Sequence, residues 1–147
     1  MPTGLIKRFK GSLLERGYDN VVVFYAGDLC RNNLGHWSTR KIKVDRVRRD
    51  FKFFTAKDIA MSDEADYGFM IWDGESQGTV NNVLNLLERG KKVVVYLSPN
   101  REFITLTCPA DATELLKRID RGLADVLDKK VGLRRRIAAS QQALGLA

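Results

Sequence analysis

Residues 67–97, YGFMIWDGESQGTVNNVLNLLERGKKVVVYL, decide the fold class of this chain. The apolar stretch 67–72 predicts a strand, and the Val-rich stretch 91–97 predicts a second one. Between them, the apolar residues of 80–87 recur at helical spacing and give one apolar face to a helix that ends at Gly90. Because short connections join strand, helix and strand, we predict a βαβ unit and therefore a parallel sheet.

The loop 73–79, DGESQGT, lies between the first of these strands and the helix. Ligands of open parallel sheets bind beyond the carboxyl ends of the strands, where such loops stand. Gly78 has no Cβ and lets a ligand approach the backbone closely. The first amides of the helix, near Gly78, Thr79 and Val80, carry the positive end of the helix dipole and favour an anion.

Four polar side chains of the same loop add to this prediction. The hydroxyls of Ser76 and Thr79 can donate hydrogen bonds to a ligand. Asp73 and Glu75 would repel a phosphate, so ribose hydroxyls or a base edge are the expected partners of these two carboxylates. The alternative is a well-capped helix start that binds nothing, since Ser, Thr and Gly are common at caps and turns.

The remaining elements complete an α/β pattern in which we expect one domain over residues 1–147, with a core at 20–98 and C-terminal helices at 109–147. The expected architecture is a three-layer α/β/α fold with a mostly parallel central sheet. The last helix is expected to pack on the body of the protein or on a second subunit. The predicted strands are 20–27, 40–44, 50–54 and 102–107, and the predicted helices are 5–16, 55–65 with Thr55 as N-cap, 112–130 with an interruption at Gly122, and 133–147.

The composition is ordinary for a globular protein, with 44% hydrophobic and 29% charged residues among 147. No apolar run approaches the roughly 18 residues that a membrane span needs, and the N-terminus does not have the pattern of a signal peptide. Cys30, Cys108 and the single His36 do not have the spacing of metal ligands. We therefore predict no metal and no cofactor, and a cytoplasmic location.

The net charge of +7 is concentrated in two segments. Residues 38–57 contain eight Lys and Arg residues against two Asp, and residues 128–147 contain five against one. Charge runs of this kind are usually solvated faces. The alternative is a surface that attracts nucleotides or a polyanion such as DNA.

Residues 65–96, together with AKDIAMSDEAD at 56–66 and YAGDLCRNN at 25–33, resemble the SLOG superfamily. These Rossmann-like domains include DNA-processing proteins of the Smf/DprA type, lysine-decarboxylase-like (LOG) phosphoribohydrolases and several uncharacterised bacterial families. The shared pattern is a strand ending in Asp-Gly, then Ser-x-Gly-Thr opening a helix, then a Lys-rich entry to the next strand. The match covers residues 20–98 and implies a Rossmann-like fold that binds a nucleotide or a nucleotide derivative. A homodimer is expected by the same analogy.

The resemblance also implies which residues bind the ligand. The expected phosphate-and-ribose loop consists of Asp73, Gly74, Ser76, Gly78 and Thr79, with Asn82 beside it, and the expected facing wall consists of Gly27, Asp28, Arg31 and Asn32. The guanidinium fork of Arg31 suits an oxyanion, although a plain surface arginine explains the residue equally well.

Asn82 separates the possible functions, because related phosphoribohydrolases have a catalytic Glu at this position. An amide is neither a nucleophile nor a proton acceptor of the carboxylate kind. The first hypothesis is therefore a non-catalytic nucleotide-binding module with a role as a sensor. The second is an N-glycosidic hydrolase or transferase in which Glu75 or Asp73 replaces the missing carboxylate, and the third is a DNA-binding protein.

Overall fold

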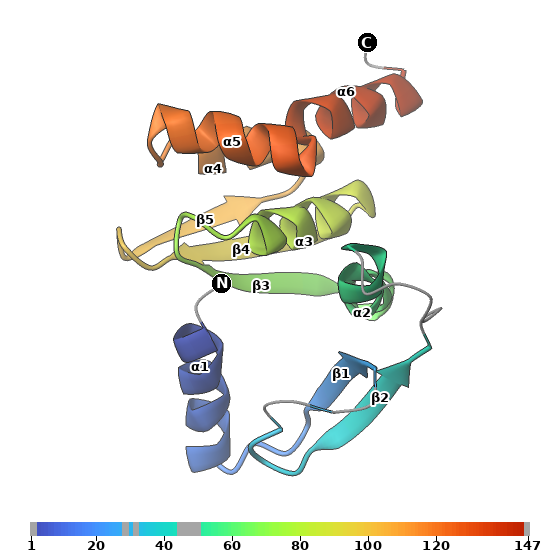
Figure 1. Ribbon diagram of the computed structural model, residues 1–147, viewed down its shortest axis with the longest axis vertical. Helices are drawn as coiled ribbons and strands as arrows, with labels where there is room; N and C mark the ends of the chain where they lie inside the picture. The colour runs from blue at the N-terminus through green and yellow to red at the C-terminus, as the bar shows by residue number, and fades with distance from the viewer. Residues whose placement is uncertain (1–2, 28–29, 31–32, 44–50, 146–147) are drawn as a thin grey trace. The chain divides into compact units, whose positions relative to one another are not determined.

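The computed structural model describes residues 3–27, 30, 33–43 and 51–145 and has a mixed α/β fold (Figure 1). Contacts within the chain divide it into two compact units, which we call the N-terminal unit (residues 2–64) and the C-terminal unit (residues 65–147). The single domain stays a prediction. None of the described helices has the length and apolarity of a bilayer span. The elements in chain order are α1 (Thr3–Glu15), β1 (Val22–Ala26), β2 (Ser38–Ile42), α2 (Phe51–Glu64), β3 (Tyr67–Trp72), α3 (Gln77–Glu88), β4 (Lys92–Leu97), β5 (Glu102–Leu106), the 3-10 helix η1 (Pro109–Ala112), α4 (Thr113–Leu116), α5 (Arg121–Val131) and α6 (Leu133–Ala143).

The N-terminal unit contains helices α1 and α2 and a parallel pair of strands, β1 and β2. Helix α1 ends before Gly17, whose φ of 64° suits a glycine, as the sequence predicted. Trp37 is buried just before β2, where its indole N–H donates to the Tyr18 carbonyl at 3.1 Å. The Asn33 side chain holds the backbone of Trp37 through two hydrogen bonds of 2.9 Å. A buried tryptophan thus ties the start of β2 to the residues that follow α1.

The predicted strand 50–54 is wrong, because residues 51–54 form the first turn of α2. Thr55 is consequently inside that helix and is not its N-cap. The stretch 50–54 is too short to distinguish an alternating pattern from a helical one. No Gly or Pro separates it from the helical pattern that follows, so helical hydrogen bonding continues through both segments.

The C-terminal unit is built on the predicted βαβ unit. Strands β3 and β4 pair in parallel with Tyr67 opposite Lys92 and Trp72 opposite Leu97, which confirms the predicted parallel pair. Helix α3 connects them and ends at Glu88, two residues before Gly90, which has a φ of 72°. Strand β5 then pairs with β4 in the antiparallel direction, so this sheet is mixed.

One face of the β3–β4–β5 sheet carries the core of this unit. Alternate side chains along the strands, among them Trp72, Val95 and Ile104, are buried against α3, η1, α4, α5 and α6. On α3, the apolar face predicted at 80–87 is fully packed, since Val80, Val83 and Leu84 are all 0% exposed. Burial of this size stabilises the unit by roughly 1.5–3 kcal/mol for each large aliphatic side chain.

The helical segment after β5 breaks earlier than predicted. Helix α4 ends at Leu116 and α5 begins at Arg121, so Gly122 lies in the first turn of α5 instead of at an interruption. The break occurs at Asp120, whose carboxylate caps α5 by accepting from the amides of Gly122 and Leu123. An N-cap of this kind stabilises the start of a new helix, which explains why the chain turns here.

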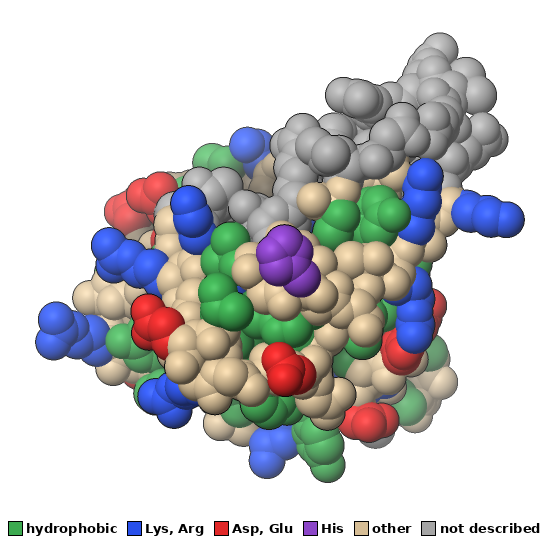
Figure 2. All heavy atoms as spheres, turned by 90° about the horizontal axis from the view of Figure 1, so that it is seen from below, with side chains coloured by type: hydrophobic (Ala, Val, Ile, Leu, Met, Phe, Trp, Pro, Cys, Tyr) green, Lys and Arg blue, Asp and Glu red, His purple; other side chains and the backbone are tan. Residues whose placement is uncertain are grey.

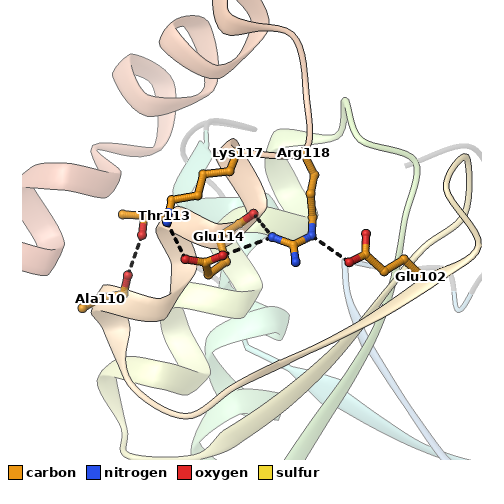
Figure 3. Close-up of polar contacts among 6 residues, drawn as sticks. All are labelled: Glu102, Ala110, Thr113, Glu114, Lys117 and Arg118. Atoms are coloured by element: carbon orange, nitrogen blue, oxygen red, sulfur yellow. Dashed lines mark hydrogen bonds and ion pairs between the residues drawn. The ribbon is translucent and has the colours of Figure 1, made fainter.

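Arg118 fixes the segment that leads to this break (Figure 3). Its Nε donates to Glu102 at 3.1 Å, and its Nη1 donates to the Glu114 carbonyl at 2.8 Å and to the Glu114 carboxylate at 3.2 Å. Hydrogen bonds from Lys117 and Arg118 lower the pKa of Glu114 below its ordinary value. Arg118, two residues after α4, is thereby joined both to that helix and to Glu102, the first residue of β5.

The last helix packs on the body of its own unit, one of the two predicted alternatives. Leu133 and Ile137 of α6 are buried in the core. Arg136 adds a polar contact, because its guanidinium donates to Asn81 at 2.6 Å, to Asn85 at 2.9 Å and, through Nε, to Glu88 at 3.0 Å. These three acceptors lie along one side of α3, so a single arginine fastens α6 to that helix.

Candidate functional site at the start of helix α3

The predicted ligand loop lies at the carboxyl end of β3, between that strand and α3. Trp72, the last residue of β3, is fully buried and anchors the loop from below. Its indole N–H donates to the Ser76 carbonyl at 3.1 Å, while its own carbonyl accepts from the Ser98 amide at 2.9 Å. The loop is therefore fastened to the core at both of its ends.

Asp73 shapes the loop from within. One carboxylate oxygen, Oδ1, accepts from the amides of Glu75 at 2.9 Å and Ser76 at 2.8 Å. Such a turn satisfies two backbone donors that would otherwise point away from the strand. The oxygen that the sequence assigned to a ribose is thus used by the protein itself, and only Oδ2 has no partner among the described residues.

Gly74 is required by the backbone. Its φ of 86° lies in the left-handed region, where a side chain is strained. A Cβ at this position would meet Leu97 at 3.6 Å and Ile119 at 3.5 Å, which are ordinary contacts. Space is therefore not the constraint, and the loop depends on the conformational freedom of glycine. Ile119, which follows Arg118 in the chain, is thus one of the two side chains nearest to this position.

Helix α3 begins two residues earlier than the sequence suggested, with Gln77 instead of Thr79 as its first residue. Ser76 has the extended backbone of an N-cap, with φ −65° and ψ 115°, but its side chain accepts no hydrogen bond from the first turn. Gln77 and Gly78 are exposed. A Cβ at Gly78 would have only Ser76 Oγ nearby, at 3.9 Å. Only the first two residues of the helix are therefore exposed, at the end where the dipole is positive, whereas Thr79 and Val80 of the same turn are buried.

Two polar side chains of α3 lie next to this open turn. Thr79 is buried, and its hydroxyl is 3.3 Å from Ser76 Oγ in a hydrogen bond between the two side chains. Asn82, one turn further along, has a buried Oδ1 without a hydrogen-bond partner among the described residues. Buried polar atoms of this kind cost free energy unless a ligand or water satisfies them. Asn82 thus has a buried acceptor without a partner among the described residues, one turn from the exposed residues Gln77 and Gly78.

The facing wall is not established. Gly27 follows β1 and has a φ of 86°, which explains a glycine there. Asp28, Arg31 and Asn32 lie outside the described residues. Since Gly27 belongs to the N-terminal unit and the α3 loop belongs to the C-terminal unit, the meeting of the two loops stays a prediction.

The N-glycosidic alternative relies on two carboxylates of the loop, Glu75 and Asp73. Glu75 is exposed, and Asp73 already accepts hydrogen bonds from two amides of its own loop.

The described residues contain no group of three or more His, Cys, Asp or Glu side chains arranged for a metal ion.

At least one charged side chain of the first basic segment has partners within the protein. In the described part of residues 38–57, Arg40 forms an ion pair with Glu64 and lies over the Phe24 ring, 5.1 Å from its centroid. On the face shown in Figure 2, Lys and Arg side chains stand apart from one another, with Asp and Glu side chains among them. The described side chains on this face therefore do not form a continuous basic patch.

Sequence reasoning missed Gln77 as a site residue, because the apolar pattern of the helix begins only at Val80. Ser76, a common N-cap residue, was the signal that places the helix start at 77. Comparison with known proteins adds nothing to the site: no family model matches the chain, and no curated protein or solved structure is significantly similar to it.

Proposed function

We propose that the loop 73–79 and the first turn of α3 bind the phosphate of a nucleotide or of a nucleotide-derived molecule. The observation that carries this proposal is the exposed, uncapped backbone of Gln77 and Gly78 at the carboxyl end of a parallel strand. Helix amides in such a position bind oxyanions because donors and dipole act together. The resemblance to Rossmann-like nucleotide-binding domains supports the same ligand class.

Asn82 supports a nucleotide over a bare anion. Its buried Oδ1 lies four residues beyond Gly78, which corresponds to about 6 Å along the helix axis. A hydroxyl or an amino group of a ligand whose phosphate lies at Gly78 would satisfy this acceptor. The remaining Asp73 oxygen offers a second acceptor for the same sugar or base.

We further propose that the protein binds its ligand without transforming it and acts as a sensor. Asn82 stands where the related enzymes have a catalytic Glu, and Asp73 is engaged within the loop. The N-glycosidic alternative predicts release of free base from a nucleotide panel, and that release would have to disappear in Glu75→Gln or Asp73→Asn. Release that depends on either residue would overturn the non-catalytic role.

Replacing Gly78 by valine tests the binding site. A Cβ at Gly78 would have only Ser76 Oγ within 4 Å, at 3.9 Å, whereas a phosphate bound to the amides would be crowded by the new side chain. Calorimetric titration with mono-, di- and cyclic nucleotides should therefore show at least a tenfold loss of affinity, about 1.4 kcal/mol, with little change in thermal stability. Gly4→Val is the matched control, because Gly4 is the second residue of α1 as Gly78 is of α3 and also has open space around it.

Two outcomes of that titration contradict the proposal. Wild-type protein that binds no nucleotide at millimolar concentration would remove the function. Equal affinities of wild type and Gly78→Val would show that a ligand binds elsewhere. A loss of affinity in Gly78→Val supports the proposal only if the Gly4→Val control binds like wild type.

We propose, finally, that the whole chain adopts the Rossmann-like three-layer arrangement. Parallel strand pairs in both units support this, as does the fact that the helices of the C-terminal unit pack on one face of its sheet. In a parallel strand, alternate amides point to opposite edges, so β3 within a continuous sheet has both sets protected. Hydrogen exchange of the β3 amides tests this proposal, which predicts slow exchange of all of them. Fast exchange of every second β3 amide would show that β3 is an edge strand and would exclude the continuous sheet.

A further inference from the structure

The turn between α5 and α6 concentrates the positive charge of the C-terminal unit. We call residues 128–136 the α5–α6 corner. It contains five Lys and Arg residues against one Asp, whereas the rest of residues 65–147 contains seven basic and nine acidic residues. The unit is therefore electrically polar, with a net charge of +4 at the corner and −2 elsewhere.

Two of the five cations have partners within the protein. Arg134 lies 3.2 Å from Asp128, and Arg136 is held by Glu88, Asn81 and Asn85. Lys129, Lys130 and Arg135 are exposed and form no ion pair among the described residues. The three unpaired cations thus face solvent within seven residues of sequence.

These three residues flank the turn at Gly132. Gly132 ends α5 in the left-handed conformation, with φ 68° and ψ 38°, and starts α6 directly. A Cβ at Gly132 would lie 3.0 Å from Arg135 Nη2, so the guanidinium of Arg135 lies over the turn. Lys129 and Lys130 form the last turn of α5 immediately before it.

Helix electrostatics explains the two lysines but not the arginine. Lysines near a helix C-terminus interact favourably with the dipole, so Lys129 and Lys130 are expected on stability alone. Arg135 lies in the first turn of α6, where the dipole disfavours a cation. Its neighbours Arg134 and Arg136 offset the same cost through ion pairs with Asp128 and Glu88. Arg135 forms no ion pair among the described residues. An anion from outside the protein would provide the missing compensation.

We propose that the α5–α6 corner binds the phosphate backbone of a nucleic-acid duplex without reading its sequence. The Arg fork and the two flexible Lys ammonium groups suit phosphodiester oxygens. A bilayer is a poorer partner, because the apolar side chains of the corner, Val131 and Leu133, are half-buried and buried. This surface is independent of the nucleotide site at α3.

Fluorescence anisotropy of a short labelled DNA duplex tests this surface. Three phosphate contacts predict that the logarithm of the binding constant falls against the logarithm of salt concentration with a slope of about −3. Lys129→Glu with Lys130→Glu should weaken binding at least about tenfold and make the slope shallower by about 2. Lys91→Glu with Lys92→Glu is the control, since it replaces another adjacent lysine pair of this unit and changes the net charge equally.

Circular dichroism melting first shows that both variants are folded, and Arg135→Gln gives a milder change should the double variant fail that check. In a competition experiment, we expect polyphosphate to displace the duplex and a mononucleotide not to displace it. This result would show that the duplex binds outside the α3 site. Equal losses in the corner variant and the control would overturn the proposal, because net charge alone would then explain binding. Absent duplex binding, or tighter binding to polyglutamate or to phosphatidylserine vesicles, would overturn it as well.

Discussion

Replacing Trp72 by alanine is expected to lower the free energy of unfolding of the C-terminal unit by about 3–5 kcal/mol, the largest single effect in this protein. The side chain is 0% exposed, so its removal leaves a cavity beneath the ligand loop. The Ser76 carbonyl also loses the indole N–H that it accepts at 3.1 Å. Urea unfolding followed by circular dichroism measures the change.

Trp72→Phe separates packing from loop geometry. Phenylalanine keeps most of the apolar volume but cannot donate to Ser76, so we expect a cost nearer 1 kcal/mol together with weaker nucleotide binding. Trp37, the other tryptophan of the chain, lies in the N-terminal unit and provides a fluorescence probe of that unit in both variants. A Trp72→Ala protein as stable as wild type would show that this residue does not anchor the core.

Replacing Arg136 by alanine should cost about 2–3 kcal/mol, the second largest effect. The substitution leaves Glu88, Asn81 and Asn85 without their shared donor. The largest part of this cost is expected at Asn85, because it is 7% exposed and its Nδ2 already lacks a partner among the described residues. Losing one member of a buried charged network is costly because the other polar groups stay buried. The partial exposure of Arg136 and Glu88, 20% and 31%, keeps the estimate below that for a fully buried pair.

Arg134→Ala is the control for this change. Arg134 lies on the same helix, is 67% exposed and, among the described residues, pairs only with Asp128, so its loss should cost less than about 1 kcal/mol. Arg136→Lys should recover only part of the stability, because one ammonium group cannot reproduce a planar fork directed at three acceptors. Equal effects of the Arg134 and Arg136 substitutions in urea unfolding would contradict the proposed fastening of α6 to α3.

The segment 67–97 was predictable because its pattern repeats. The apolar runs at 67–72 and 91–97 and the helical spacing of Val80, Val83 and Leu84 are each long enough to identify the element. Residues 50–54 offered a single short run, and there the prediction was wrong. The break at Asp120 was predicted slightly too late, because the sequence marks Gly122 more strongly than the aspartate that caps the helix.

The contacts that shape the site were not predictable from patterns. Arg136 reaches residues 48 to 55 positions away, and nothing in a local window connects them. The role of Asp73 was hidden for a different reason: a carboxylate after a strand suits a ligand or a turn equally well until the hydrogen bonds are seen. Gly78, by contrast, was predicted as a point of close approach, and its backbone is exposed.

The amide resonances of Gln77 and Gly78 provide the most direct test of the central claim. Titration of nitrogen-15-labelled protein with a nucleoside monophosphate, and in parallel with the nucleoside alone, should shift these two resonances strongly only when the phosphate is present. The amides of Gly122 and Leu123 at the start of α5 serve as an internal reference, because Asp120 already occupies them. Shifts confined to other residues, or equal shifts with the nucleoside alone, would show that the start of α3 does not bind a phosphate.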